Sequence, residues 1–188
     1  LGLQGLHIPE AYGGQGFSFV ELGIVLEEFG RSLLCAPYFS TVVLAANAIL
    51  NAGSEEQKAK LLPGLASGET VGTLAFTEPS GRWDASGITM EASGSGDSVE
   101  LDGTKMFVLD GHTATLIVVA ARAAGTSGED GIAFYTVAGD APGLTRTALA
   151  TMDQTRKQAK LEFAGVKAEP LGAVGSGPDW SLVSHGEV

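Results

Sequence analysis

The sequence predicts an α+β protein, in which part of an N-terminal helical bundle is followed by an antiparallel β-barrel or β-sandwich. Before about residue 70, apolar residues recur at helical spacing behind capping motifs. Beyond it, short apolar segments alternate with polar positions, and no helical pattern is long enough to connect parallel strands. We therefore expect a helical domain, truncated at its start, at residues 1–70, a β-domain at 71–172 and the start of a C-terminal helical domain at 173–188.

Three helices are predicted in the first part. Ser18 and Glu21 form the two ends of a capping box, and the apolar residues that follow at positions 22, 25, 26 and 29 place one stripe toward a core. A second helix is expected over residues 40–52, with Gly53 as its stop. A second capping box at residues 54–57 starts the third helix, which we expect to close around Pro63 and Gly64.

Seven short strands are predicted in the second part, at residues 70–77, 88–92, 98–101, 104–109, 116–122, 132–137 and 160–163. Asp102-Gly103 separates two of them and is typical of a tight hairpin turn, because both positions tolerate positive φ. A further helix is expected to begin near Pro178.

Composition excludes several classes of function. The chain of 188 residues has 22 acidic and 11 basic residues, and its net charge of −11 argues against nucleic acid as a general partner. The only cysteine, Cys35, lies among apolar residues and is expected to be buried and inert, which fits a reducing, cytoplasmic compartment. The strongest apolar run, residues 116–121, ends at Arg122 and is too short to span a membrane.

Residues that carry chemistry do not by themselves predict a function. The histidines His7, His112 and His185 have no metal-ligand spacing, so no metal site is expected. The glycine-rich segments at 13–16 and 94–96 do not have the spacing of a phosphate-binding loop and are better explained as turns.

Two segments carry a resemblance to a known family. Thr77-Glu78-Pro79-Ser80-Gly81-Arg82-Trp83-Asp84 follows a predicted strand, and Lys105-Met106-Phe107-Val108-Leu109-Asp110-Gly111 forms an aromatic strand after it. Together they resemble the Thr-Glu-Pro turn ending in Gly-Ser-Asp, and the Lys-Met-Trp-Ile-Thr-Asn-Gly strand, of the acyl-CoA dehydrogenases. Weaker similarities at residues 6–16, 26–31, 53–69 and 161–166 occur in the family's order, so the resemblance covers nearly the whole chain.

The resemblance implies an FAD-dependent oxidoreductase of fatty acid metabolism that removes an α-proton and a β-hydride from an acyl-CoA thioester. It implies an acyl-CoA substrate, a protein that accepts the electrons, and a homo- or hetero-oligomer, with a tetramer as the expectation. Thr77 is expected to donate to the pyrimidine edge of the flavin, and Phe107 to stack on its rings, although Phe107 read alone would be a barrel core residue. The full set of expected cofactor-binding residues is Leu74, Phe76, Thr77, Arg82, Trp83, Phe107 and Leu109.

The chain departs from the family's pattern at four of these positions. Arg82-Trp83 replaces a Gly-Ser pair, so Trp83 is also expected to contact substrate, and Arg82 is expected to compensate by meeting a phosphate or carboxylate. Phe107 replaces a tryptophan, and Leu109 replaces a threonine that would donate to the flavin. Glu78 is expected to shape its turn rather than act as a base, and the family's base is expected in the C-terminal bundle beyond this chain. Two alternatives stay open, a non-catalytic partner subunit with a degenerate flavin site and a fragment that keeps only the fold.

Overall fold

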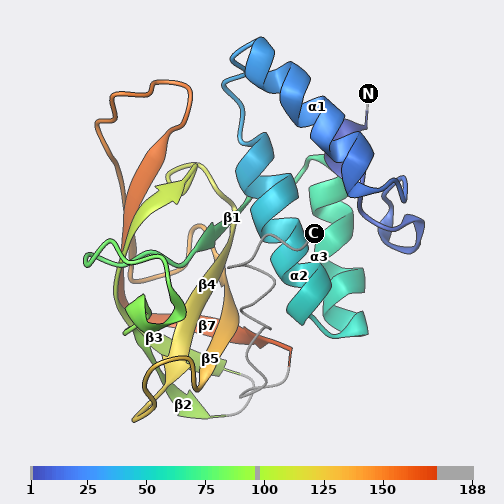
Figure 1. The fold of residues 1–188 in the computed structure, drawn as a ribbon. Helices are drawn as coiled ribbons and strands as arrows, with labels where there is room; N and C mark the ends of the chain where they lie inside the picture. The colour runs from blue at the N-terminus through green and yellow to red at the C-terminus, as the bar shows by residue number, and fades with distance from the viewer. Residues whose placement is uncertain (1, 96–97, 173–188) are drawn as a thin grey trace.

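The computed structural model describes residues 2–95 and 98–172, and it has a helical part packed against the side of a β-domain (Figure 1). Two 3₁₀ turns, η1 (Leu3–Gly5) and η2 (Glu10–Tyr12), precede helix α1 (Phe19–Arg31). The π-helical segment η3 (Phe39–Ala45) continues into α2 (Ala46–Ala52), and α3 (Glu55–Ser67) completes the helical part. The first strand begins at Gly72, and the helix predicted near Pro178 lies outside the described residues.

Both predicted capping boxes are confirmed. The Ser18 side chain accepts from the backbone of α1 while the Glu21 carboxylate accepts from the Ser18 backbone, and Ser54 and Gln57 make the same exchange at the start of α3. These bonds satisfy N–H groups that have no partner within the helix. The starts of these two helices are therefore determined by four-residue sequences.

The predicted end of the third helix is wrong. α3 continues through Pro63 to Ser67 and ends at Gly68, which adopts a left-handed φ of 81°. Proline inside a helix removes one hydrogen bond and costs about 3 kcal/mol. Leu65 and Ala66, which belong to the continuation, are buried against the rest of the molecule. Their packing holds the last turn in place despite the proline.

The predicted second helix consists of two successive segments of different helix type. Its first half, η3, is a π-helix, and only its second half is an α-helix that ends before Gly53. π-helical turns are rare and often occur at functional sites. Side-chain contacts from this segment to the first strand hold it in place, and no periodicity in the sequence indicates them.

The β-domain consists of seven strands, β1 (Gly72–Ala75), β2 (Glu91–Ser95), β3 (Ser98–Leu109), β4 (Leu116–Ala123), β5 (Ile132–Ala138), β6 (Leu144–Ala148) and β7 (Gln158–Leu171). Five of them close a ring in the order β4-β2-β3-β7-β5 and back to β4, while β1 adds to β4 and β6 to β7. The predicted α+β class with a β-barrel is confirmed. The pairings are antiparallel except that β4 runs parallel to both β1 and β2.

Two details of the predicted strands are wrong. Asp102-Gly103 is not a hairpin turn, because β3 runs through it as one strand of 12 residues with a register shift against β7. The Asp102 carboxylate instead accepts from the backbone of Gly165 at 2.8 Å. Strand β6, whose side chains are mostly exposed, was not predicted, because it lacks the alternation of a strand with one buried face.

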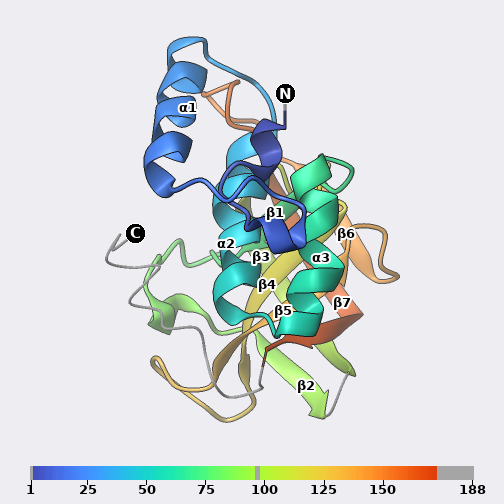
Figure 2. The same cartoon turned by 90° about the vertical axis from the view of Figure 1, so that its right-hand side faces the viewer.

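The buried apolar residues of the described chain form three clusters. One fills the barrel, and the second lies between the barrel and helices α2 and α3, which cover one side of it (Figure 2). A smaller third cluster packs Leu22 of α1 against Tyr38 and Val42. Leu74 of β1 belongs to the second core, whereas its neighbour Ala75 belongs to the first, as expected for successive residues of a strand. Within the described part of the chain, no helix has the length and apolar character needed to cross a membrane.

Candidate functional site

The site develops where the end of β1 and the end of β3 lie side by side. Met106 of β3 donates its backbone N–H to the carbonyl oxygen of Thr77 at 2.8 Å. Further along the same two segments, the Thr73 hydroxyl donates to the carbonyl oxygen of Leu109 at 2.6 Å. The two segments that carried the family resemblance are therefore joined in space.

Phe107 is turned out of the barrel by a bulge in β3. The register against β7 shifts between Lys105 and Val108, and Phe107 adopts a φ of 57°, in the left-handed region that a bulky residue rarely occupies. Its side chain is 47% exposed, whereas Val108 is buried in the barrel. Phe107 is therefore not a barrel core residue, and its ring is available to a ligand. A strained backbone of this kind is common at functional sites.

A buried ion pair lies beside the bulge and joins β3 to the loop after β1. The Lys105 ammonium, which is fully buried, donates to the Glu78 carboxylate at 2.7 Å and to the carbonyl oxygen of Phe76 at 3.4 Å. The Glu78 carboxylate also accepts from the backbone N–H groups of Thr89 and Met90. The bonds of Glu78 agree with its expected role in shaping the turn.

Both charges of the pair are present near neutral pH. Burial opposes ionisation of Glu78, but the Lys105 charge and the hydrogen bonds outweigh it, so the pKa of this carboxyl lies below its ordinary value. Burial lowers the pKa of Lys105 to about 8, and the attraction of Glu78 offsets part of that effect. Glu78 therefore stays ionised, but its lowered pKa and its hydrogen bonds make it a poor proton acceptor and thus a poor general base.

Trp83 projects from the loop after β1. Its side chain is 75% exposed and meets the ring of Phe76 edge-on, with the ring centroids 6.3 Å apart. Trp83 is therefore not a core residue. The Arg82 guanidinium is already paired, because it donates to the Asp84 carboxylate at 3.1 and 2.9 Å. The expected contact of Arg82 with a phosphate would have to break this pair.

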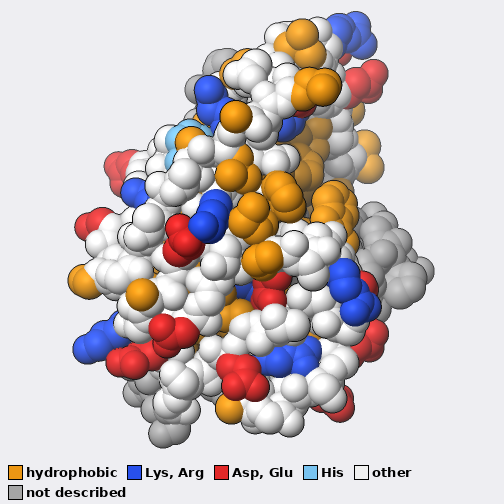
Figure 3. Space-filling view, turned by 90° about the vertical axis from the view of Figure 1, so that its left-hand side faces the viewer, with side chains coloured by type: hydrophobic (Ala, Val, Ile, Leu, Met, Phe, Trp, Pro, Cys, Tyr) orange, Lys and Arg blue, Asp and Glu red, His pale blue; other side chains and the backbone are white. Residues whose placement is uncertain are grey.

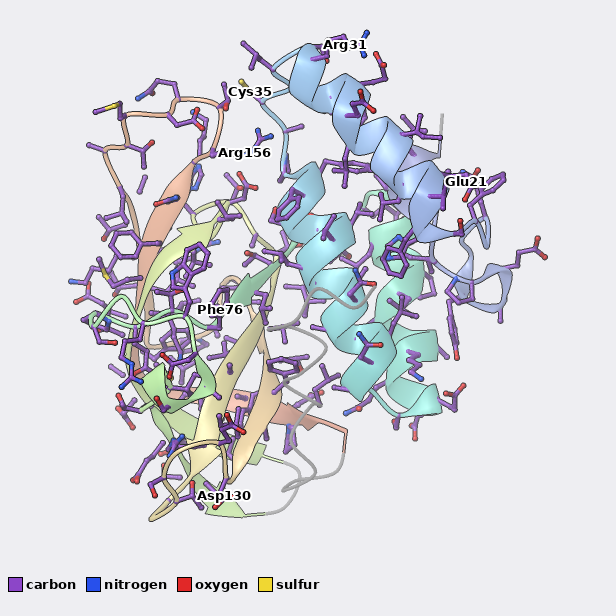
Figure 4. All side chains as sticks on the ribbon, in the orientation of Figure 1. Glu21, Arg31, Cys35, Phe76, Asp130 and Arg156 are labelled. Carbon is purple, nitrogen blue, oxygen red and sulfur yellow. The ribbon has the colours of Figure 1, made fainter. Side chains whose placement is uncertain are left out.

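The remaining expected residues differ in what they offer a ligand. Thr77 is buried, and its hydroxyl makes no hydrogen bond to any other residue of the described chain, so it is free to donate. The Leu74 side chain is buried against the helices, which leaves only its backbone for a cofactor contact. Figure 4 places Phe76 centrally, between the helices and the β-domain.

Leu109 lines a groove of about 610 Å³, together with Phe39, Thr151, Met152, Asp153, Arg156 and Gln158. Figure 3 shows hydrophobic side chains gathered in a band on the face seen from the left-hand side of Figure 1. Phe39 comes from η3, and Met152 from the loop between β6 and β7. Sequence reasoning missed both residues, since neither belongs to a family motif and only the fold brings them to Leu109.

The loop between β6 and β7 also contacts the loop after α1. Arg156 donates to the carbonyl oxygen of Leu34 at 3.3 Å, and Figure 4 shows Arg156 and Cys35 on the same side of the molecule. Cys35 is exposed, so the expectation that it is buried is wrong. The apolar neighbours that suggested burial include Leu33, which is itself exposed at the end of α1.

Family models match most of the chain. Residues 1–69 match the model described as "Acyl-CoA dehydrogenase, N-terminal domain", and residues 73–166 match "Acyl-CoA dehydrogenase, middle domain". An acyl-CoA dehydrogenase of Bacillus subtilis is 34% identical over 146 residues, which cover 77% of this chain and 38% of the relative. Isovaleryl-CoA dehydrogenase of Bos taurus is 37% identical over 124 residues, or 65% of this chain and 29% of the relative.

Solved structures give the same result. A glutaryl-CoA dehydrogenase in complex with glutaryl-CoA has a TM-score of 0.85 at 29% identity, over 94% of this chain and 47% of that one. A glutaryl-CoA dehydrogenase from Mycobacterium smegmatis in complex with FADH2 has a TM-score of 0.79 at 29% identity, over 93% and 46%. The ChsE4–ChsE5 complex from Mycobacterium tuberculosis has a TM-score of 0.79 at 31% identity, over 93% of this chain and 45% of that one. The chain thus spans less than half the length of these relatives.

Proposed function

The chain belongs to the acyl-CoA dehydrogenase family, and on that premise we propose that it forms the flavin-facing part of an FAD-dependent acyl-CoA dehydrogenase. The reaction would be α,β-dehydrogenation of an acyl-CoA thioester to a 2-enoyl-CoA. One observation carries the proposal, the exposed ring of Phe107 on a left-handed bulge next to the Thr77 loop. An exposed aromatic side chain on a strained backbone adds nothing to the packing of the core, so its position favours a role in ligand binding.

The residues present fit a flavin. Phe107 offers a flat apolar face for the ring system, and stacked aromatic rings contribute about 0.5–1.5 kcal/mol beyond the area they bury. The free Thr77 hydroxyl offers a hydrogen bond to a polar ring edge. Leu109 supplies an apolar wall of the adjoining groove, although it lacks the hydroxyl of the family's threonine. Bound FAD supplies the hydride acceptor for the reaction.

The chain's own residues orient the ligands and exclude water from them. The Lys105–Glu78 pair fixes the Thr77 loop against β3, so that Phe107 and Thr77 keep a constant separation. Trp83 stands at the edge of this surface, where its indole would meet a substrate or the flavin itself. We assign no residue of this chain as the base, because Glu78 is held as a paired anion.

Partners follow from the same proposal. The substrate would be an acyl-CoA, the electrons would pass to an acceptor protein, and the enzyme would be a homo- or hetero-oligomer in the cytoplasm. The heteromeric relative from Mycobacterium tuberculosis supports an oligomer. We favour the flavin-binding enzyme over the non-catalytic partner subunit, because a degenerate site would have no use for an exposed Phe107.

A titration of flavin tests the proposal. FAD is added to the full chain freed of flavin, and quenching of its fluorescence gives the Kd. Phe107→Ala should weaken FAD binding by about tenfold, which corresponds to loss of one stacking contact. Phe17→Ala, at an equally exposed phenylalanine before α1, should leave it unchanged. Absence of FAD binding by the unsubstituted protein, or equal effects of the two substitutions, would contradict the proposal.

A further inference from the structure

Ser40 and Asp110 join the helical part to the end of β3. The Ser40 side chain is fully buried at the start of η3, and its hydroxyl donates to the Asp110 carboxylate at 2.7 Å. Asp110 follows the last residue of β3 and has a left-handed φ of 52°, which aspartate tolerates better than most residues. Its backbone N–H donates to the carbonyl oxygen of Lys157 at 2.9 Å. The hydrogen bonds of Asp110 therefore connect η3, β3 and the start of β7.

The next residues repeat the connection through β1. Thr41 of η3 donates its hydroxyl to the carbonyl oxygen of Gly72 and accepts from the N–H of Gly72, both at 3.1 Å. Thr73, the next residue of β1, donates to the carbonyl oxygen of Leu109 at 2.6 Å. Thr41 and Thr73 are buried. The carbonyl of Leu109 and the carboxylate of Asp110 are thus held from two directions by neighbouring residues of the helical part and β1.

Ser40 and Asp110 are the sequence neighbours of two residues that line the groove. Phe39 directly precedes Ser40, and Leu109 directly precedes Asp110, and both Phe39 and Leu109 line the groove next to the proposed flavin surface. Buried hydrogen bonds to a charged acceptor are directional and contribute more than bonds between neutral groups. A bond between Ser40 and Asp110 therefore constrains the separation of Phe39 and Leu109 more tightly than apolar packing alone would.

We propose that Ser40 and Asp110 are positioning residues that set the width of the groove between Phe39 and Leu109 and thereby the fit of the flavin. This inference rests on the proposed function. Neither residue lines the groove, since Ser40 is fully buried and the Asp110 carboxylate accepts its hydrogen bond. Asparagine at position 110 has a carbonyl oxygen that can accept the same bond, whereas alanine has no acceptor.

The test compares FAD affinity with thermal stability in the full chain, by fluorescence titration and by melting. Ser40→Ala and Asp110→Ala should each raise the Kd for FAD by about tenfold, and the double substitution should raise it no further, because both remove the same bond. Asp110→Asn should stay within about twofold of the unsubstituted protein. Ser93→Ala is the control, since it removes an exposed hydroxyl of β2 that donates to the carbonyl oxygen of Glu100 at 3.1 Å, away from the groove. It should leave the Kd unchanged.

The outcomes separate this inference from the proposed function. If the unsubstituted protein binds FAD, but Ser40→Ala and Asp110→Ala bind it equally well while melting at lower temperature, the pair is structural only and the positioning role is wrong. If the unsubstituted protein binds no FAD, the proposed function fails, and the positioning role fails with it. Should Ser40→Ala not fold, the difference in Kd between Asp110→Asn and Asp110→Ala decides, and equal values would overturn the inference.

Discussion

Lys105 and Phe107 lie two residues apart on β3 and reverse the usual distribution of charged and aromatic side chains. The lysine is buried and the phenylalanine is nearly half exposed. The bulge between Lys105 and Val108 causes this reversal, because it shifts the alternation of inward and outward positions. The buried ion pair of Lys105 with Glu78 therefore lies directly beside the bulge that exposes Phe107.

Removal of one partner of that pair should be strongly destabilising. Lys105→Met leaves the Glu78 carboxylate buried without its countercharge, and such changes cost about 3–5 kcal/mol. Urea denaturation would measure the free energy of unfolding. The exposed pair of Lys60 and Glu169 is the control, and Lys60→Met should cost at most about 1 kcal/mol. Equal losses for the two substitutions would show that burial of the pair has no energetic consequence.

Trp83→Ser should alter ligand binding without lowering stability. The indole is 75% exposed and makes one edge-on contact with Phe76, so its removal should change the free energy of unfolding by about 0.5 kcal/mol or less. Under the proposed function, flavin retention or the preference among acyl-CoA chains should change. Flavin absorbance after purification and the Kd values for short, long and branched acyl-CoAs measure these properties. A lower melting temperature with unchanged flavin content and substrate profile would refute this role for Trp83.

At the scale of elements, the contact between η3 and β1 determines how the helices meet the barrel. Thr41 bonds both backbone groups of Gly72, and a side chain at position 72 would have little room. A Cβ atom there would lie 2.7 Å from the Cβ of Ala45 and 3.0 Å from Leu65. Gly72 therefore permits the close approach of helix and strand that places Phe39 at the groove.

Two glycine substitutions should have opposite effects on stability. Gly72→Ala forces η3 and α3 away from β1, and overpacking of this kind costs about 1–3 kcal/mol. Gly23→Ala lies in α1, where no atom would meet the new Cβ within 4 Å, and it should stabilise the helix by up to about 1 kcal/mol. Chemical denaturation measures both. If Gly72→Ala were as stable as the original protein, the close approach would not be a constraint.

At the scale of the whole molecule, stability is unevenly distributed. The barrel is closed by a ring of five strands, and β4 buries six consecutive residues between the two cores. Helix α1 buries only Leu22 and lies at the edge of the molecule (Figure 1). Its outer side carries exposed apolar residues such as Val20 and Ile24.

Hydrogen exchange should follow this distribution. Backbone amides of α1 should exchange by local opening, at a free energy well below that of global unfolding, whereas those of β4 and β5 should exchange only when the whole domain unfolds. Exchange monitored by mass spectrometry on peptides of each element would measure the protection. Comparable protection of α1 and β4 would mean that the helix is held by contacts beyond those described.

The sequence by itself determined the features that depend on a few adjacent residues. The capping boxes at Ser18 and Ser54 fix the starts of α1 and α3, because their hydrogen bonds span only three residues. The change from helical to alternating periodicity located the passage from helices to strands between Ser67 and Gly72. The order of short family motifs identified the family. It also indicated the two segments that form the candidate site, although their ligand contacts stay a prediction.

Only the tertiary structure decided the features that depend on residues far apart in the chain. α3 passes through Pro63 because distant packing of Leu65 and Ala66 holds its last turn, and β3 passes through Asp102-Gly103 because β7 pairs along both sides of it. The meeting of Phe39 with Leu109 is likewise absent from any local pattern. The physical reason is the same in each case. Local propensities differ by about 1–3 kcal/mol, and burial of one or two large side chains against distant segments is enough to reverse them.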